Sequence, residues 1–163
     1  MGEGMKNLKK LNIIGVLEEE VLVKKKPILG ICLGMQMLAK TSQEDGLHQC
    51  LGWIDGEVKK LDVGPEWRVP HVGWNTVDFK EGNSLFTRVS QGANFYFDHG
   101  YHFVCAPQYV NATCRYGKDV VAAVQKDNIF GVQFHPEKSQ NNGLRLFRSF
   151  FNYTQTLSKV ANV

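Results

Sequence analysis

A short apolar run, Pro27-Ile28-Leu29-Gly30-Ile31, most constrains how this chain folds. It is too short for a helix, and proline and glycine bound it, so we expect a strand buried on both faces. A helix over Leu33–Ala39 is predicted to follow at once. Two further helices are predicted before it, over about residues 4–11 and 16–25. Helix, buried strand, tight turn and helix are the element order of an α/β fold.

The second half of the chain has the pattern of a strand-rich region that ends in a helix. Polar breaks at 117–119 and 126–128 fit hairpin turns. The closing helix should lay one apolar face on the sheet, formed by Leu144, Leu146, Phe147, Phe150 and Phe151. We expect one domain over residues 1–163, with a mixed central sheet flanked by helices. The predicted strands are Trp53–Leu61, Val69–Phe79, Phe95–Phe97, Tyr109–Tyr116, Val120–Gln125 and Ile129–Phe134.

Composition excludes several classes of function. The 163 residues carry a formal net charge of +3, and their basic residues are scattered apart from Lys24–Lys26. We therefore expect no nucleic-acid partner. No export signal or long apolar run is visible, so we expect neither secretion nor a membrane span. The four cysteines have no C-x-x-C spacing, which indicates a cytoplasmic protein without a metal site or a disulfide framework.

The segment Gly30-Ile31-Cys32-Leu33-Gly34 has the Gly-x-Cys-x-Gly form of a nucleophile elbow. Small residues on either side let the backbone turn sharply and expose Cys32. The cysteine would stand at a helix amino terminus, where the macrodipole and free N–H groups favour a thiolate. A buried cysteine in a glycine-containing turn would give the same five residues, so the segment alone does not decide between the two.

A second segment, Phe134-His135-Pro136-Glu137, offers the partners that a thiol nucleophile needs. A base must take the proton of the thiol, and the base needs a group that orients it. His135 ends an apolar strand, because Pro136 prevents the strand from continuing. Glu137 lies two residues on, close enough to fix the tautomer of the imidazole. A lone histidine before proline is otherwise a turn residue.

Taken together, Lys26–Gln36 and Gly131–Ser139 resemble the paired signature of class I glutamine amidotransferases. The similarity runs from about Gly4 to Phe151, and it implies a flavodoxin-like α/β fold. Three intermediate segments are similar to the glutaminase subunit of imidazole glycerol phosphate synthase: Gly52–Gly56, Pro70–Asn75 and Phe95–His102.

The resemblance implies a role for each matching residue. Cys32 attacks the carboxamide of L-glutamine, His135 moves the proton and Glu137 orients His135, with no cofactor and no metal. Gln36 stands one helical turn past Cys32 and would grip the amino-acid head of the substrate. The implied substrate-binding residues are Gln36, Glu44, Tyr96 and Tyr101. The residues implied to face a partner are Trp74 and Lys138, whose alternatives are a core aromatic and an ordinary surface cation.

The resemblance also implies a partner, a (β/α)₈-barrel cyclase that forms a heterodimer with the glutaminase and uses its ammonia in histidine biosynthesis. The same chemistry could instead supply ammonia for the amidation of a surface-polysaccharide sugar. A non-catalytic subunit that only binds the partner is a further alternative, and a hydrolase with an unrelated cysteine elbow is another.

Two departures from the family pattern stand out. Gly100 replaces a serine or threonine that is common in the family, so a side-chain hydroxyl near the substrate is lost. Family members also begin with a strand, a helix and further strands, and a glycine-rich stretch there supplies N–H groups to the oxyanion hole. We find no such segment before Gly4, and therefore expect the domain to be incomplete at its amino end and its activity to be reduced.

Overall fold

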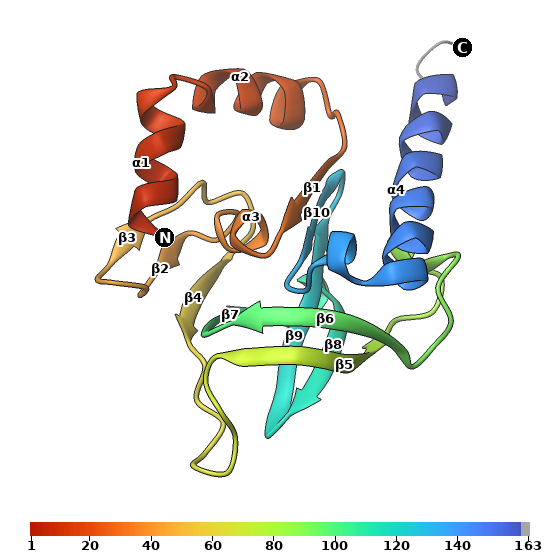
Figure 1. The fold of residues 1–163 in the computed structure, drawn as a ribbon. Coiled ribbons are helices and arrows are strands. Elements are labelled where there is room, and N and C mark those ends of the chain that lie inside the picture. The colour runs from red at the N-terminus through yellow and green to blue at the C-terminus, as the bar shows by residue number, and fades with distance from the viewer. Residues whose placement is uncertain (161–163) are drawn as a thin grey trace.

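The computed structural model describes the backbone of residues 1–160 and the side chains of residues 1–157. Its larger sheet is mixed, as predicted, and has six strands (Figure 1). β1 and β10 pair in parallel, whereas the other neighbours are antiparallel. In spatial order the strands are β1 (Ile28–Ile31), β10 (Ile129–Val132), β9 (Lys118–Lys126), β8 (Val110–Tyr116), β5 (His71–Phe79) and β6 (Ala93–His99).

A smaller sheet of four strands lies beside the first. The predicted strand over Trp53–Leu61 is confirmed in shortened form as β4, but β2, β3 and β7 were not predicted. Gly100 separates β6 from β7, so the chain leaves one sheet and enters the other at this residue. In spatial order the strands are β3 (His48–Gln49), β2 (Thr41–Ser42), β4 (Gly56–Lys60) and β7 (Tyr101–Cys105).

The predicted helices are present with altered bounds. The first prediction corresponds to α1 (Gly2–Lys10), and the second to α2 (Ile14–Glu18) continued by a π-helical turn, η1 (Glu19–Val23). The helix after the buried strand is shorter than predicted and covers only α3 (Leu33–Gln36). Three 3₁₀ turns and the closing helix complete the chain: η2 (Ser84–Phe86), η3 (Pro107–Tyr109), η4 (Pro136–Lys138) and α4 (Gln140–Val160).

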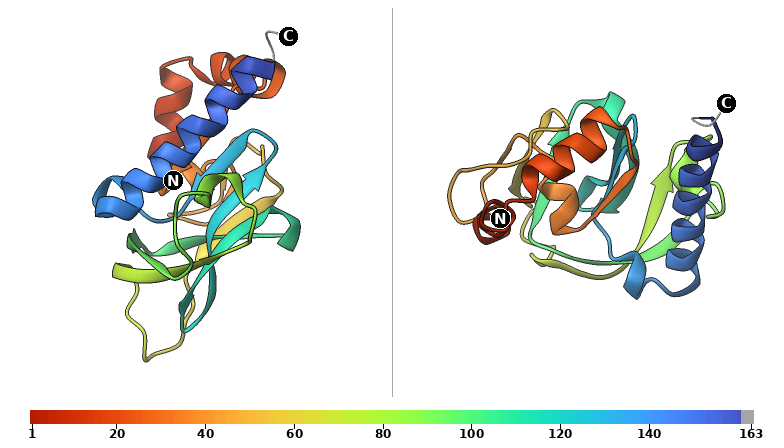
Figure 2. Two further views of the ribbon diagram at one scale, coloured as in Figure 1. Left: turned by 90° about the vertical axis from the view of Figure 1, so that its right-hand side faces the viewer. Right: turned by 90° about the horizontal axis from the view of Figure 1, so that it is seen from above.

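The closing helix α4 packs against the larger sheet (Figure 2). Its buried stripe differs from the predicted one. Leu146 is fully buried, and the rings of Phe150 and Tyr153 meet Phe130 edge-on, at centroid distances of 5.8 and 5.0 Å. The prediction that Leu144 and Phe151 lie on this face is wrong, since they are 56% and 57% exposed. The buried positions of α4 recur every three residues, at Gly143, Leu146 and Ser149.

Two apolar clusters form the core, and α3 belongs to the second of them. One lies between α4 and the larger sheet and includes Phe95, Phe97 and Phe134. The other joins α3 to the smaller sheet and includes Met35 and Phe103. Between them, the carboxyl ends of β1 and β10 and the turn from β6 to β7 meet at one edge. Among the residues described, no helix is both long and apolar enough to cross a membrane.

Candidate active site

Cys32 occupies the sharp turn between β1 and α3, as the elbow pattern predicts. Its backbone has φ 48° and ψ −103°, a strained conformation for a residue with a side chain. Gly30 makes the turn possible, because a Cβ at that position would lie 2.6 Å from the carbonyl oxygen of Gly34. Gly34 itself has open space around it. The steric requirement for glycine therefore falls on the residue before the cysteine.

The thiol of Cys32 contacts one group from β6 and another from the residue that follows β10. It donates to the carbonyl oxygen of Asp98 at 3.8 Å and accepts from Nε2 of Gln133 at 3.7 Å. Burial raises the pKa of the Cys32 thiol above its usual value, and the nearby Leu33 N–H does not offset it. The N–H at the helix terminus favours the thiolate, as expected, but burial outweighs it and the pKa of Cys32 is raised on balance. A helix of four residues has too few aligned peptides to outweigh desolvation.

His135 and Glu137 are in direct contact, with Nδ1 of the imidazole 2.6 Å from Oε1 of the carboxylate. This contact assigns the neutral imidazole a proton on Nδ1 and leaves Nε2 as an acceptor. The backbone of His135 is also fixed. Its N–H donates to the carbonyl of Tyr96 at 2.8 Å, and its carbonyl accepts from Oγ of Ser139 at 2.6 Å.

The structure brings Cys32 and His135 to the same edge of the larger sheet. Ile31 and Val132 are paired in the parallel register of β1 and β10, and the N–H of Cys32 donates to the carbonyl of Val132 at 2.8 Å. His135 follows three residues later. Among the described side chains, however, the thiol bonds to Asp98 and Gln133 and not to the imidazole. Catalytic contacts of this kind often tighten only when substrate binds.

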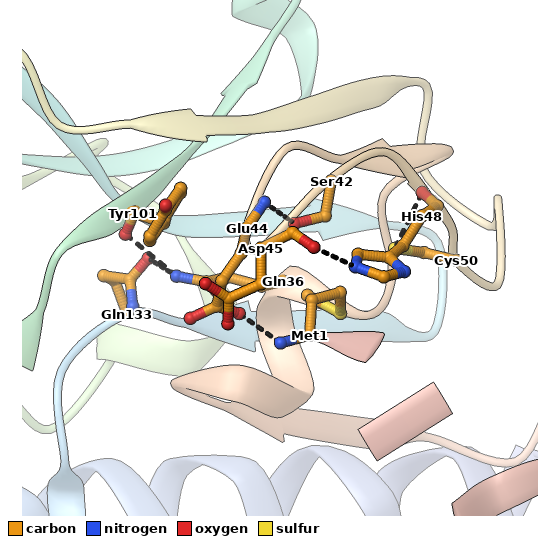
Figure 3. Close-up of polar contacts among 9 residues, drawn as sticks. All are labelled: Met1, Gln36, Ser42, Glu44, Asp45, His48, Cys50, Tyr101 and Gln133. Atoms are coloured by element: carbon orange, nitrogen blue, oxygen red, sulfur yellow. Dashed lines mark hydrogen bonds and ion pairs between the residues drawn. The ribbon is translucent and has the colours of Figure 1, made fainter. Parts of the chain in front are cut away.

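Gln36 lies one turn past Cys32 on α3, and its side chain is 4% exposed. Figure 3 shows its amide between Tyr101 and Gln133. Nε2 donates to the carbonyl of Tyr101 at 2.9 Å and to Oε1 of Gln133 at 3.1 Å. The amide nitrogen thus donates both of its hydrogen bonds to protein groups, and Gln36 connects the elbow helix to β7. Its role toward substrate stays a prediction.

Glu44 lies between β2 and β3, in the region drawn in Figure 3, and its carboxylate pairs with the ammonium of Met1. The backbone N–H of Glu44 is held in turn by Oγ of Ser42, at 3.2 Å. The predicted contact of Glu44 with substrate stays a prediction.

Tyr96 lies with the two residues predicted to face a partner. Its ring meets Trp74 edge-on at 6.0 Å, and Nζ of Lys138 lies 5.3 Å from the ring centroid. Trp74 is 49% exposed, so the alternative of a core aromatic is wrong. The structure gathers Trp74, Tyr96 and Lys138, hereafter the aromatic–lysine cluster, beside His135. The carbonyl of Tyr96 accepts from the N–H of His135. The predicted contact of Tyr96 with substrate stays a prediction.

Two site residues were not singled out from the sequence. Gln133 is fully buried and contacts both Cys32 and Gln36. Ser139 accepts from the N–H of Tyr96 at 3.0 Å while it donates to the carbonyl of His135. A polar glutamine inside an apolar strand was a usable signal, since buried polar groups need partners. Within residues 1–157, no group of three or more potential metal ligands occurs.

This elbow, with a His–Glu pair just after the adjacent parallel strand, has the arrangement expected of a cysteine-dependent acyl-transfer enzyme on an α/β fold. The chain belongs to the class I glutamine amidotransferase family, whose model (glutamine amidotransferase class-I) matches residues 4–153. It is a glutamine amidotransferase.

Proteins similar in sequence to this chain include two subunits of imidazole glycerol phosphate synthase. Imidazole glycerol phosphate synthase subunit HisH 2 of Vibrio vulnificus is 48% identical over 153 residues, which cover 94% of this chain and 72% of that protein. Subunit HisH 1 of Campylobacter jejuni is 47% identical over 148 residues, covering 91% and 74%.

Solved structures agree on the fold. A glutamine amidotransferase of Thermotoga maritima superposes with a TM-score of 0.60 at 23% identity, over 94% of this chain and 59% of the other. Another glutamine amidotransferase superposes with a TM-score of 0.70 at 21% identity, over 93% and 72%. The predicted family and fold class are confirmed.

Proposed function

We propose that this chain is the glutaminase subunit of an imidazole glycerol phosphate synthase, in the cytoplasm. It hydrolyses L-glutamine through Cys32, His135 and Glu137 and passes ammonia to a (β/α)₈-barrel cyclase in histidine biosynthesis. The single observation that carries the chemistry is the 2.6 Å contact between His135 and Glu137 at the edge where Cys32 emerges. The 48% identity to a named HisH subunit supports the choice of partner.

The chemistry begins with a proton transfer, because the thiolate is the nucleophile. Burial keeps that proton on Cys32, so a base must take it as glutamine binds. Nε2 of His135 is the acceptor, since Nδ1 donates to Glu137. Sγ then bonds to the carboxamide carbon, and the proton passes from His135 to the departing nitrogen, which leaves as ammonia. Water activated by the same Nε2 cleaves the thioester to glutamate and restores the thiol.

The aromatic–lysine cluster is the proposed docking surface for the cyclase. Exposed tryptophan and tyrosine side chains are typical anchors of protein interfaces. The cluster is joined to the catalytic strand, because the carbonyl of Tyr96 accepts from the N–H of His135. A partner seated on Trp74 would therefore cover the side of the site from which ammonia has to leave without meeting water.

The function is tested by mixing the chain with the cyclase subunit and measuring glutamate formation. The wild type should form glutamate, with ammonia incorporated into the cyclase product, and Cys32→Ala should form none. If the two are equally inactive while both bind the cyclase, the chain is a non-catalytic binding subunit. Turnover only with a sugar-amidating partner would assign the ammonia to a polysaccharide instead.

A further inference from the structure

Two buried histidines lie behind the site and take no part in the proposed proton transfer. His71 begins β5 and His99 ends β6, and the two are paired across these antiparallel strands. They are 3% and 5% exposed. The imidazole of His71 lies between the rings of Phe97 and Tyr116, stacked at centroid distances of 4.7 and 3.8 Å. Such packing leaves the ring no freedom to turn.

The hydrogen bonds of these histidines run in one direction. A ring nitrogen of His99, Nδ1, lies 2.9 Å from the carbonyl oxygen of Tyr101, which can only accept, so this nitrogen carries the proton. Nε2 of His99 must then accept, and Nδ1 of His71 donates to it at 3.2 Å. The remaining nitrogen of His71, Nε2, is left as an acceptor for Nδ2 of Asn75 at 3.4 Å.

The orientation of Asn75, at the start of this chain of bonds, is fixed independently. Its Oδ1 accepts from the N–H of Thr76 at 2.8 Å, and its Nδ2 also donates to the carbonyl of Arg115 at 3.0 Å. Asn75 therefore presents an N–H to His71. The bonds run from Asn75 through His71 and His99 to Tyr101, and both imidazoles must be neutral with the proton on Nδ1.

The residues at the end of this series of hydrogen bonds contact the elbow region at two points. The carbonyl of Tyr101 accepts from both His99 and Nε2 of Gln36. On the other side of His99, the carbonyl of Asp98 accepts from the thiol of Cys32. His99 thus lies between the two carbonyls that hold the nucleophile and the helix behind it.

We propose that Asn75, His71 and His99 form a relay that positions the Asp98–Tyr101 turn against Cys32 and Gln36. His71 and His99 are positioning residues for the thiol, not catalytic residues. The proposal rests on the proposed function in one respect, that Cys32 is the nucleophile.

The electrostatic surroundings agree with neutral rings. Burial, and then the neighbouring His99, lower the pKa of His71 to about 4, and burial lowers the pKa of His99 to about 4 despite its contact with Tyr101. The other charged or titratable groups near the pair are Asp98, His102, Tyr116 and His135. At the thiol itself, Asp98 and Glu137 act in the same direction as burial and raise the pKa of Cys32.

The relay is tested first in the unaltered protein. Long-range ¹H–¹⁵N spectra report which ring nitrogen of a neutral histidine carries the proton. At about pH 7, His71 and His99 should both be neutral with the proton on Nδ1, and their signals can be assigned from spectra of His71→Phe. A proton on Nε2 of either ring would overturn the proposal, because the bonds could not then run from Asn75 to Tyr101.

The second test measures the effect on Cys32, as the rate of alkylation by iodoacetamide against pH, read on the peptide that contains this residue. His71→Phe keeps the stacked ring but cannot donate a hydrogen bond to His99. The turn that contains Asp98 is then no longer positioned, and the Asp98 carbonyl no longer accepts from the thiol of Cys32. The midpoint of the alkylation rate against pH should move to lower pH, because the hydrogen bond that stabilises the neutral thiol is lost. The loss of one such bond should make alkylation about threefold to tenfold faster near neutral pH. His71→Asn keeps an N–H near the Nδ1 position and should retain the wild-type midpoint.

An unchanged midpoint in His71→Phe, or an equal shift in both variants, would overturn the relay. Neither test needs glutamine turnover. A wild-type protein with the expected tautomers but no glutaminase activity would contradict the proposed function and leave the relay standing.

Discussion

Gly30 and Gly34 approach so closely that a methyl group on Gly30 would lie 2.6 Å from the carbonyl oxygen of Gly34. The contact is to backbone and cannot be relieved by rotating a side chain. It sets the sharpness of the turn on which Cys32 stands. The two glycines of the elbow motif are therefore unequal, and this difference can be tested.

Gly30→Ala should destabilise the protein by about 1–3 kcal/mol, the usual cost of overpacking, and should reduce glutaminase activity because the elbow must open. Gly34→Ala is the matched control. A methyl group on Gly34 would meet nothing within 4 Å, and alanine favours the helix by up to about 1 kcal/mol. Urea unfolding of both variants checks the prediction, and equal stabilities would contradict it.

Glu137→Gln should lower kcat by about 10²-fold or more with little change in KM. The amide can still accept from Nδ1 of His135, but it cannot stabilise the imidazolium that forms during proton transfer. Steady-state glutaminase assays with the cyclase present measure the effect. Glu66→Gln, an exposed surface carboxylate, serves as the control. Wild-type kcat in Glu137→Gln would remove Glu137 from the proposed triad.

Trp74→Ala should weaken binding of the cyclase by about fivefold to about 150-fold, since a half-exposed aromatic anchor loses about 1–3 kcal/mol at an interface. Phe151→Ala is the control, because Phe151 is also an exposed aromatic but lies on α4, away from the aromatic–lysine cluster. Isothermal titration with the purified cyclase gives both affinities. Equal affinities would place docking elsewhere.

Acid should destabilise the protein through buried histidines. Burial, with a contribution from Lys118, lowers the pKa of His102 to about 4, and the ring is 7% exposed with no partner for Nδ1 among the described residues. Between its unfolded pKa of about 6.5 and its folded pKa of about 4, the unfolded state binds the proton and the folded state does not. Its stabilising contribution is therefore complete above about pH 6.5 and is lost as the pH falls toward about 4.

The slope of the free energy of unfolding against pH also contains contributions from His71 and His99, because burial lowers the pKa of each to about 4 as well. His102→Phe should remove up to about 1.4 kcal/mol per pH unit from it. Urea unfolding of this variant and the wild type between about pH 7 and about pH 5 measures both slopes. Identical slopes would contradict the assignment.

The sequence predicted those parts of the fold that local pattern determines. The apolar run before Cys32 and the apolar strand before His135 became β1 and β10, and their parallel pairing brought the two motifs together. Long-range contacts decided the rest. Helix α3 ends early because the carbonyls of Met37, Leu38 and Ala39 accept from residues 51, 54 and 52. Strand β7 forms by pairing with β4, which lies far earlier in the chain.

The candidate site shows the same division. Cys32, His135 and Glu137 could be chosen from their motifs, because each belongs to a chemical role with a recognisable spacing. The raised pKa of Cys32 could not be predicted, because it depends on burial in the folded chain and on the short length of α3. Gln133 and the His71–His99 pair were missed because their partners come from other strands.

The central claim is that Cys32 forms a covalent bond to glutamine. Acid quenching of the chain during turnover with the cyclase, followed by intact and peptide mass spectrometry, tests it most directly. We predict a glutamyl thioester on the peptide that contains Cys32, and its absence from Cys32→Ala. Glutamate formation that continues unchanged in Cys32→Ala, with no adduct on the wild-type peptide, would contradict it.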